Sequence, residues 1–106
     1  MDAVTAVSGS GPAYVFHLIE ALAAAGVAEG LSEGLAMQLA RQTVCGAGEL
    51  AFRAEASAAQ LRIDVTSPGG TTAAALAVLM DAEAGLPPLM RRAVAAAAAR
   101  SRELAG

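Results

Sequence analysis

Apolar residues recur at helical spacing along most of the chain, and stretches rich in glycine, proline and hydroxyl groups separate the helical segments. Residues 13–28 are apolar on nearly every side, with only His17 and Glu20 as polar interruptions. Over residues 33–53 the apolar positions follow three- and four-residue steps, and Ser32 stands where a helix N-cap is expected. We therefore predict two long helices, over residues 13–28 and 33–53.

The rest of the chain continues this pattern. Ser57 is the expected cap of a short helix that contains Leu61 and Ile63. Longer helices are predicted over residues 69–84 and 88–104, because the Gly-Leu-Pro-Pro between them disfavours helical backbone before each proline. Residues 1–7 are predicted to be extended, and residues 8–12 to form a flexible turn. The predicted fold class is all-α, in a single domain over residues 1–106.

The helical pattern breaks most sharply at residues 65–72, Val-Thr-Ser-Pro-Gly-Gly-Thr-Thr. Ser67 is suited to cap the next helix, and Pro68 suits the first helical position, where its missing N–H costs nothing. Gly69 and Gly70 would then leave first-turn N–H groups unshielded, and such a helix start can bind an anion. Two interpretations stay open from these residues alone: a capped turn, or a pocket for a small carboxylic acid that also uses the Thr72 hydroxyl.

Composition adds an expectation about assembly. The chain is 56% hydrophobic but only 3% aromatic, and 29 of its 106 residues are alanine. Small side chains let helices approach closely, although each one buries little area. A single copy would expose much apolar surface, so we expect an obligate oligomer.

Charge and cysteine content exclude several classes of function. The net charge is −3 and there is no lysine, which excludes a phosphate-binding P-loop lysine and a Schiff-base lysine. No basic stripe suggests nucleic acid as a partner. Cys45 has no partner for an internal disulfide, and no set of metal ligands is present. Without a membrane-spanning segment or a signal peptide, the expected location is cytoplasmic.

Two further side chains could carry chemistry. His17 precedes Glu20 by three residues on a helix, so the two can meet and could act as an acid–base pair. Cys45 could be a nucleophile if a neighbour favoured its thiolate. We interpret His17 as an interior or interface residue and Cys45 as a small packed residue. Ser-Gly-Ser-Gly at residues 8–11 lacks the third glycine of a dinucleotide fingerprint.

Two segments together resemble the paired signatures of the pyrroline-5-carboxylate reductases. They are residues 8–14 (Ser-Gly-Ser-Gly-Pro-Ala-Tyr) and residues 65–72. The intervening Gly-Val and Gly-Leu pairs at residues 26–27 and 30–31, and Arg-Ser-Arg-Glu-Leu at residues 100–104, are similar too. The resemblance covers essentially the whole chain, but only the family's C-terminal domain. The N-terminal Rossmann domain of the family has no counterpart, so we expect a fragment that is inactive alone.

The resemblance implies both an activity and an assembly. The family reduces 1-pyrroline-5-carboxylate to L-proline, with hydride from NADPH or NADH that is bound mainly by the Rossmann domain; no metal is expected. The implied fold is an interlocked helical homodimer, similar to the C-terminal domains of 6-phosphogluconate-dehydrogenase-like reductases. Larger rings of dimers also occur in the family.

The resemblance also implies roles for individual residues. Ser67 and the backbone N–H groups of Gly70 and Thr71 would bind the substrate carboxylate, and Thr72 would be the catalytic hydroxyl that contacts the ring nitrogen. The residues implied near the cofactor are Glu55, Pro68 and Gly69. The alternative function is a non-catalytic helical dimerisation module, and a further one is a nucleophilic enzyme that uses Cys45 or His17.

Overall fold

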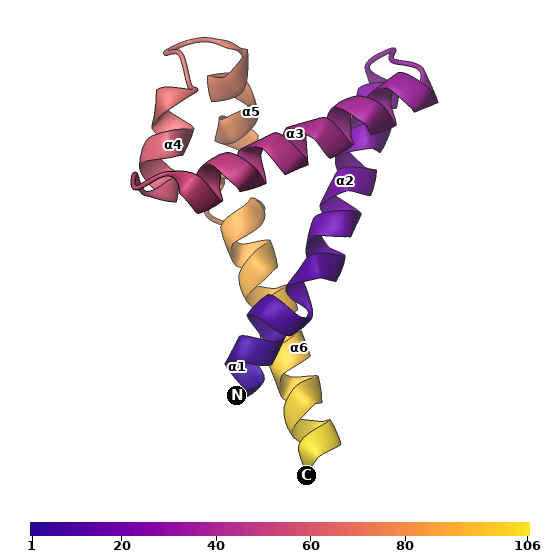
Figure 1. Ribbon diagram of the computed structural model, residues 1–106, viewed down its shortest axis with the longest axis vertical. Coiled ribbons are helices and arrows are strands. Elements are labelled where there is room, and N and C mark those ends of the chain that lie inside the picture. The colour runs from indigo at the N-terminus through magenta and orange to yellow at the C-terminus, as the bar shows by residue number, and fades with distance from the viewer. The chain divides into compact units, whose positions relative to one another are not determined.

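The computed structural model describes residues 1–106, and every regular element in it is a helix, which confirms the predicted all-α fold class. Figure 1 labels the six α-helices. In chain order they are α1 (Asp2–Val4), the π-helix η1 (Thr5–Gly9), α2 (Gly11–Ala28), α3 (Glu33–Arg53), α4 (Ala58–Asp64), α5 (Thr71–Leu79) and α6 (Leu86–Ala105). The chain divides into two compact units: Met1–Gly11 with Ala58–Gly106, and Pro12–Ser57.

A tight turn joins α2 and α3 in the unit Pro12–Ser57 (Figure 1). Gly30 has a φ of 109°, the N–H of Leu31 donates to the Gly26 carbonyl at 3.1 Å, and that of Gly30 to the Val27 carbonyl at 3.0 Å. These are the two hydrogen bonds of a Schellman motif, which uses glycine because it adopts positive φ without a steric penalty. The next helix begins as predicted, because Ser32 Oγ accepts the Leu35 N–H at 3.3 Å.

The interior of this unit consists of alanine. Ala23 on α2 and Ala36 and Ala40 on α3 form the buried cluster, with Ile19 packed against it. At Gly26 on α2 an added Cβ would lie 3.4 Å from Ala36 Cβ on α3, so the two helices approach closely near the turn. This agrees with the expectation that small side chains allow close helix approach.

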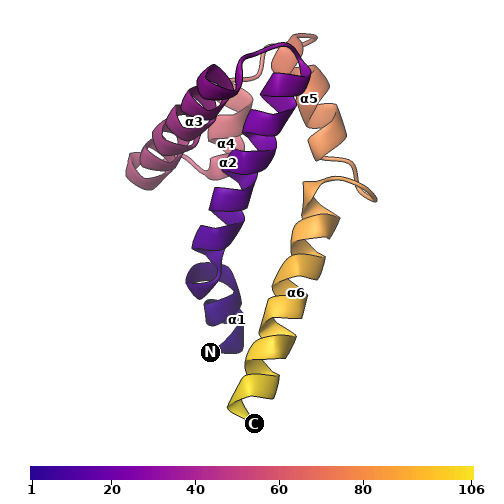
Figure 2. The same cartoon turned by 90° about the vertical axis from the view of Figure 1, so that its right-hand side faces the viewer.

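In the other unit, α6 lies along α1 and η1, as Figures 1 and 2 both show. Ala6 on η1 is completely buried, and Ser101 Oγ on α6 donates to Asp2 Oδ1 at 2.7 Å. The prediction of an extended segment at residues 1–7 is therefore wrong, as is that of a flexible turn at residues 8–12. Contacts with the last helix give residues 2–9 a partner for a helical face, and they outweigh the local β-like pattern.

The predicted bounds of the last two helices also need correction. The helix α5 ends at Leu79 rather than at residue 84, and α6 begins at Leu86 rather than at residue 88. Between them, Asp81 Oδ2 accepts the N–H groups of Ala84 at 2.7 Å and Glu83 at 3.0 Å, which stabilises a turn. The prolines lie inside the first turn of α6, where a missing N–H costs nothing.

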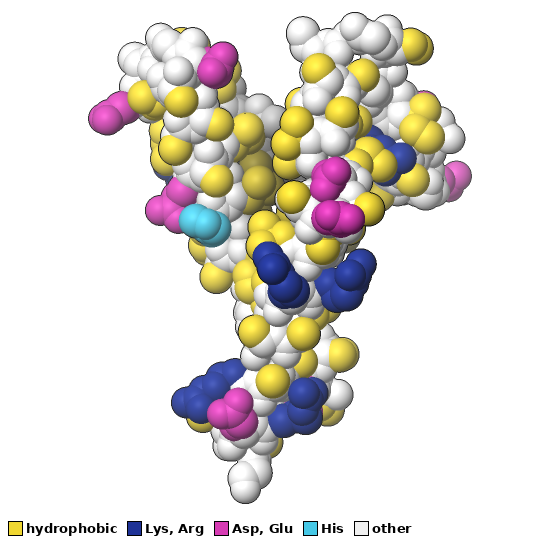
Figure 3. Space-filling view, turned by 180° about the vertical axis from the view of Figure 1, so that it is seen from behind, with side chains coloured by type: hydrophobic (Ala, Val, Ile, Leu, Met, Phe, Trp, Pro, Cys, Tyr) yellow, Lys and Arg dark blue, Asp and Glu magenta, His cyan; other side chains and the backbone are white.

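Large apolar side chains are exposed on both units. Apolar side chains of all sizes, coloured yellow, are scattered over the face that Figure 3 shows. Phe52 is 89% exposed and Phe16 is 65% exposed, whereas the only buried apolar residues are alanines. Cys45 is also exposed, so the interpretation of it as packed within the chain is wrong. The expectation of a large uncovered apolar surface on a single copy is confirmed.

One stretch, Asp2–Ala28, is long and apolar enough to cross a membrane by length and composition alone. The most apolar 18-residue window within it has a mean hydropathy of 1.3, and 6% of that window is buried within the chain. We expected no such segment from the sequence. The core helix of a soluble protein and an N-terminal signal sequence pass the same test, so it is weak support for a membrane span.

Candidate functional site

The connection between α4 and α5 places the residues of the glycine- and hydroxyl-rich motif together. At its start, Thr66 donates hydrogen bonds to two carbonyl groups at the end of α4. Its N–H donates to the Ile63 carbonyl at 3.0 Å, and its Oγ1 donates to the Arg62 carbonyl at 2.5 Å. The last carbonyls of a helix have no partner within the helix, so Thr66 serves as a C-terminal cap. These two hydrogen bonds therefore fix the direction of the backbone that leads into Ser67.

Residues 67–70 form a type II β-turn. The Gly70 N–H donates to the Ser67 carbonyl at 3.1 Å, and Gly69 has a φ of 71°. Proline at the second position and a positive-φ glycine at the third are the requirements of that turn. An added Cβ on Gly70 would lie 3.3 Å from the Ser67 carbonyl oxygen. Both glycines therefore favour the turn: Gly69 by its torsion, and Gly70 because a side chain there would crowd the Ser67 carbonyl.

The start of α5 corrects the predicted helix cap. Gly70, not Ser67, is the N-cap residue, with extended backbone (φ −90°, ψ −172°) and no side-chain capping bond. The first intrahelical bond runs from the Ala74 N–H to the Gly70 carbonyl at 3.2 Å. The N–H groups of Thr71, Thr72 and Ala73 thus have no partner within the helix.

The segment that carries these N–H groups is rich in hydroxyls and has no charged side chain. Ser67, Thr71 and Thr72 are all exposed, and no side chain between Asp64 and Asp81 can ionise. The start of a helix carries partial positive charge, so it favours a carboxylate or a similar anion. The arrangement can bind a small acid and offer hydroxyls to a second polar atom.

The other residues implied by the resemblance divide between the two units. Pro68 and Gly69 are the exposed middle residues of the turn. Glu55 is exposed and lies just after α3, in the unit Pro12–Ser57, whereas the motif lies in the other unit. The sequence did not single out Thr66, although a hydroxyl residue two positions after a helix end is a known signal for local capping.

His17 and Glu20 meet on α2, as their spacing predicts. His17 Nδ1 lies 3.3 Å from Glu20 Oε1, and the two side chains are 82% and 72% exposed. This is an open surface pair rather than an interior residue with a buried partner. No group of three or more His, Cys, Asp or Glu side chains is arranged to hold a metal ion.

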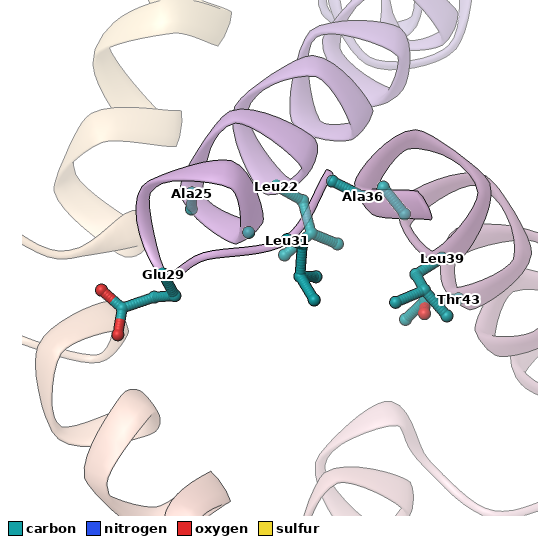
Figure 4. Close-up of a pocket in the computed structure, with 9 residues that line it drawn as sticks. Leu22, Ala25, Glu29, Leu31, Ala36, Leu39 and Thr43 are labelled. Atoms are coloured by element: carbon teal, nitrogen blue, oxygen red, sulfur yellow. The ribbon is translucent and has the colours of Figure 1, made fainter. Parts of the chain in front are cut away.

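An apolar groove of about 370 Å³ follows the junction of α2 and α3 (Figure 4). Leu22, Leu31 and Leu39 point into it, and the rest of its lining is Ala25, Gly26, Glu29, Ala36, Ala40 and Thr43. Its lining is almost wholly hydrocarbon, so it suits another apolar protein surface better than a charged metabolite.

Comparison with known proteins identifies what this arrangement is similar to. A family model described as pyrroline-5-carboxylate reductase dimerisation matches residues 1–104. The pyrroline-5-carboxylate reductase of Synechocystis sp. is 54% identical over 104 residues, which are 98% of this chain and 38% of the relative. That of Pisum sativum is 52% identical over 97% of this chain and 37% of the relative. The chain thus spans well under half the length of these curated relatives.

Solved structures agree with the sequence comparisons. The crystal structure of Plasmodium falciparum pyrroline carboxylate reductase with NADP bound superposes with a TM-score of 0.91 at 39% identity, over 100% of this chain and 40% of that one. A pyrroline-5-carboxylate reductase from Coxiella burnetii gives a TM-score of 0.90 at 46% identity, over 97% of this chain and 37% of that one. The arrangement of helices is thus that of these reductases over the matched region.

Proposed function

The chain belongs to the pyrroline-5-carboxylate reductase dimerisation family, and from that premise we propose that it supplies the dimerisation and substrate-binding part of a reductase that converts 1-pyrroline-5-carboxylate to L-proline. The observation that carries the proposal is the set of N–H donors at the start of α5 that have no partner within the helix, in a segment with exposed hydroxyls. A cyclic imine that carries a carboxylate is the class of ligand that uses both the N–H donors and the hydroxyls.

In this proposal the carboxylate lies at the first turn of α5. The N–H groups of Thr71 and Thr72 and the Ser67 hydroxyl donate to it. Gly70 was expected to contribute its N–H, but that group donates to Ser67 within the turn. We propose instead that Gly70 contributes by having no side chain, which leaves room for the turn and for the acid.

Thr72 is the proposed catalytic residue. Its hydroxyl contacts the ring nitrogen and keeps the imine carbon oriented while it accepts a hydride. A bound nicotinamide supplies the hydride, so the role of this chain is to position the substrate. Because no side chain between Asp64 and Asp81 ionises, we propose that the imine binds already protonated and needs no acid from this segment.

The cofactor and location belong to the same proposal. A related structure contains NADP, which supports a nicotinamide cofactor, with NADPH or NADH as the candidates. Glu55, Pro68 and Gly69 are proposed to lie near it in the complete enzyme. A homodimer, with rings of dimers as a further level, is supported by the family's description as a dimerisation domain. The proposed location is the cytoplasm.

The test is Thr72→Ala in a full-length reductase that carries this segment, with Thr72→Ser as the matched control. We expect kcat/KM for 1-pyrroline-5-carboxylate to fall roughly ten- to hundredfold in the alanine variant, the range for losing a hydrogen bond to a charged group. The serine variant should retain most activity. Normal turnover in a folded Thr72→Ala variant would contradict the role of Thr72.

Binding provides an independent check. Crystals of the chain soaked with proline should show the carboxylate at the N–H groups of Thr71 and Thr72. If no ligand binds there and substitutions at Ser67 and Thr72 leave turnover unchanged, the alternative of a purely structural dimerisation module would be favoured.

A further inference from the structure

We infer that Thr66 is a positioning residue for the substrate-binding turn, an inference that rests on the proposed function of residues 67–72. Thr66 is half-buried, whereas Ser67, Pro68 and Gly69 are exposed. Its hydroxyl donates to the Arg62 carbonyl at 2.5 Å and its N–H donates to the Ile63 carbonyl at 3.0 Å. The residue directly before the turn is thus anchored twice to the end of α4.

The opposite end of the turn is anchored as well. The Gly70 N–H donates to the Ser67 carbonyl at 3.1 Å, and Gly70 is the N-cap residue of α5. The Ser67 hydroxyl is therefore presented from a short turn that is held to a helix on each side. Of these anchors, the bond from Thr66 Oγ1 is the only one made by a side chain, so it can be removed without changing the backbone.

A fixed turn matters for binding because a mobile one must be ordered when the acid binds. Ordering of backbone and side chains opposes association. Loss of the Thr66 hydroxyl should weaken binding of ground state and transition state alike. Uniform weakening of this kind raises KM and leaves kcat unchanged.

The experiment compares Thr66→Val with Thr66→Ser in a full-length reductase that carries this segment. Valine preserves shape and the backbone N–H bond but removes the hydroxyl, and serine restores it. For Thr66→Val we expect KM for 1-pyrroline-5-carboxylate and the inhibition constant of proline to rise roughly fivefold, as for the loss of one hydrogen bond. The kcat should stay within about twofold of wild type, and Thr66→Ser should behave like wild type.

A substrate without a carboxylate separates positioning from general damage. The KM for 1-pyrroline, which has the imine but not the acid, should be the same in Thr66→Val and wild type. Equal rises in KM for both substrates, or a fall in kcat that Thr66→Ser does not restore, would show a merely structural role and overturn the inference.

The outcome also separates this inference from the proposed function. If Thr66→Val behaves like wild type while Thr72→Ala is impaired, the role of Thr66 is wrong and the site remains. If both variants behave like wild type, the site itself is wrong and the inference falls with it. If Thr66→Val does not fold, the KM for 1-pyrroline-5-carboxylate is compared with the KM for 1-pyrroline in Thr66→Ala instead. A ratio of these two KM values equal to that of wild type overturns the inference.

Discussion

Gly85 has no room for any side chain, and Gly85→Ala is the most disruptive small substitution that the structure identifies. A Cβ atom at this position would lie 2.4 Å from the Leu79 carbonyl oxygen and 2.5 Å from both the backbone nitrogen and the carbonyl oxygen of Asp81. The φ of Gly85 is −84°, which any residue can adopt, so the cost comes from contact and not from torsion.

The magnitude follows from the atoms that would have to move. All three are backbone atoms, one in the last residue of α5 and two in the α5–α6 connection, so no flexible side chain can yield. Overpacking typically costs about 1–3 kcal/mol, and the rigid surroundings place Gly85→Ala near the upper end, at about 3 kcal/mol. For a chain of this size, that corresponds to a fall of roughly 10 °C in the melting temperature.

The assay is thermal unfolding followed by circular dichroism at one fixed protein concentration. Gly34→Ala is the matched control, because Gly34 lies in α3 and an added Cβ there meets nothing within 4 Å. The control should be neutral or stabilising by up to about 1 kcal/mol, since alanine favours helix over glycine. If Gly85→Ala melts within about 2 °C of Gly34→Ala, the reasoning about contact at Gly85 is refuted.

Three further predictions concern backbone torsion, pH and assembly. Gly69→Ala should lower stability by about 1 kcal/mol and Gly69→Asn by less, because Gly69 has a φ of 71° and open space around it; equal unfolding free energies in urea would contradict this. Hydrogen bonds donated by the N–H of Ala84 and, to a lesser extent, that of Glu83 lower the pKa of the Asp81 carboxyl below 3.8. The stability that the Asp81 carboxylate contributes to the fold is therefore present above that pH and is lost as the pH falls further. Asp81→Asn keeps an acceptor oxygen but cannot titrate, so its stability relative to wild type should rise on acidification, and a difference independent of pH would disprove the assignment. The chain should be at least a dimer by light scattering, and a stable monomer would contradict the argument from exposed apolar surface.

The sequence predicted best the elements whose signals are local. Ser32 and Gly30 specify the end of α2 and the start of α3 through their own hydrogen bonds and torsion, and α3 matches its predicted bounds. The interior of alanines also followed from composition. In each case the deciding interactions involve residues within a few positions of one another.

The failures occurred where distant contacts or competing local signals decide. The sequence pattern of residues 1–7, taken alone, indicates extended backbone, but Asp2 accepts a hydrogen bond from Ser101, which is 99 residues away in sequence. At the candidate site, Ser-Pro-Gly-Gly fits both a capped helix start and a type II turn. The turn occurs, so the helix begins at Thr71 and the Gly70 N–H is already used. The motif identified the site, but not which donors remain available.

An interior made only of alanines changes how this chain should respond to random substitution. The buried residues Ala6, Ala23, Ala36 and Ala40 have almost nothing to lose by truncation and can only be enlarged. The large apolar side chains, whose loss normally costs most, lie on the outside of a single copy. In a scan of every position, the usual link between burial and intolerance should therefore be inverted for truncations. Leu, Val and Phe residues on the surface of one copy should be the sensitive ones, and a map of tolerance should trace the surface that we propose a second copy covers.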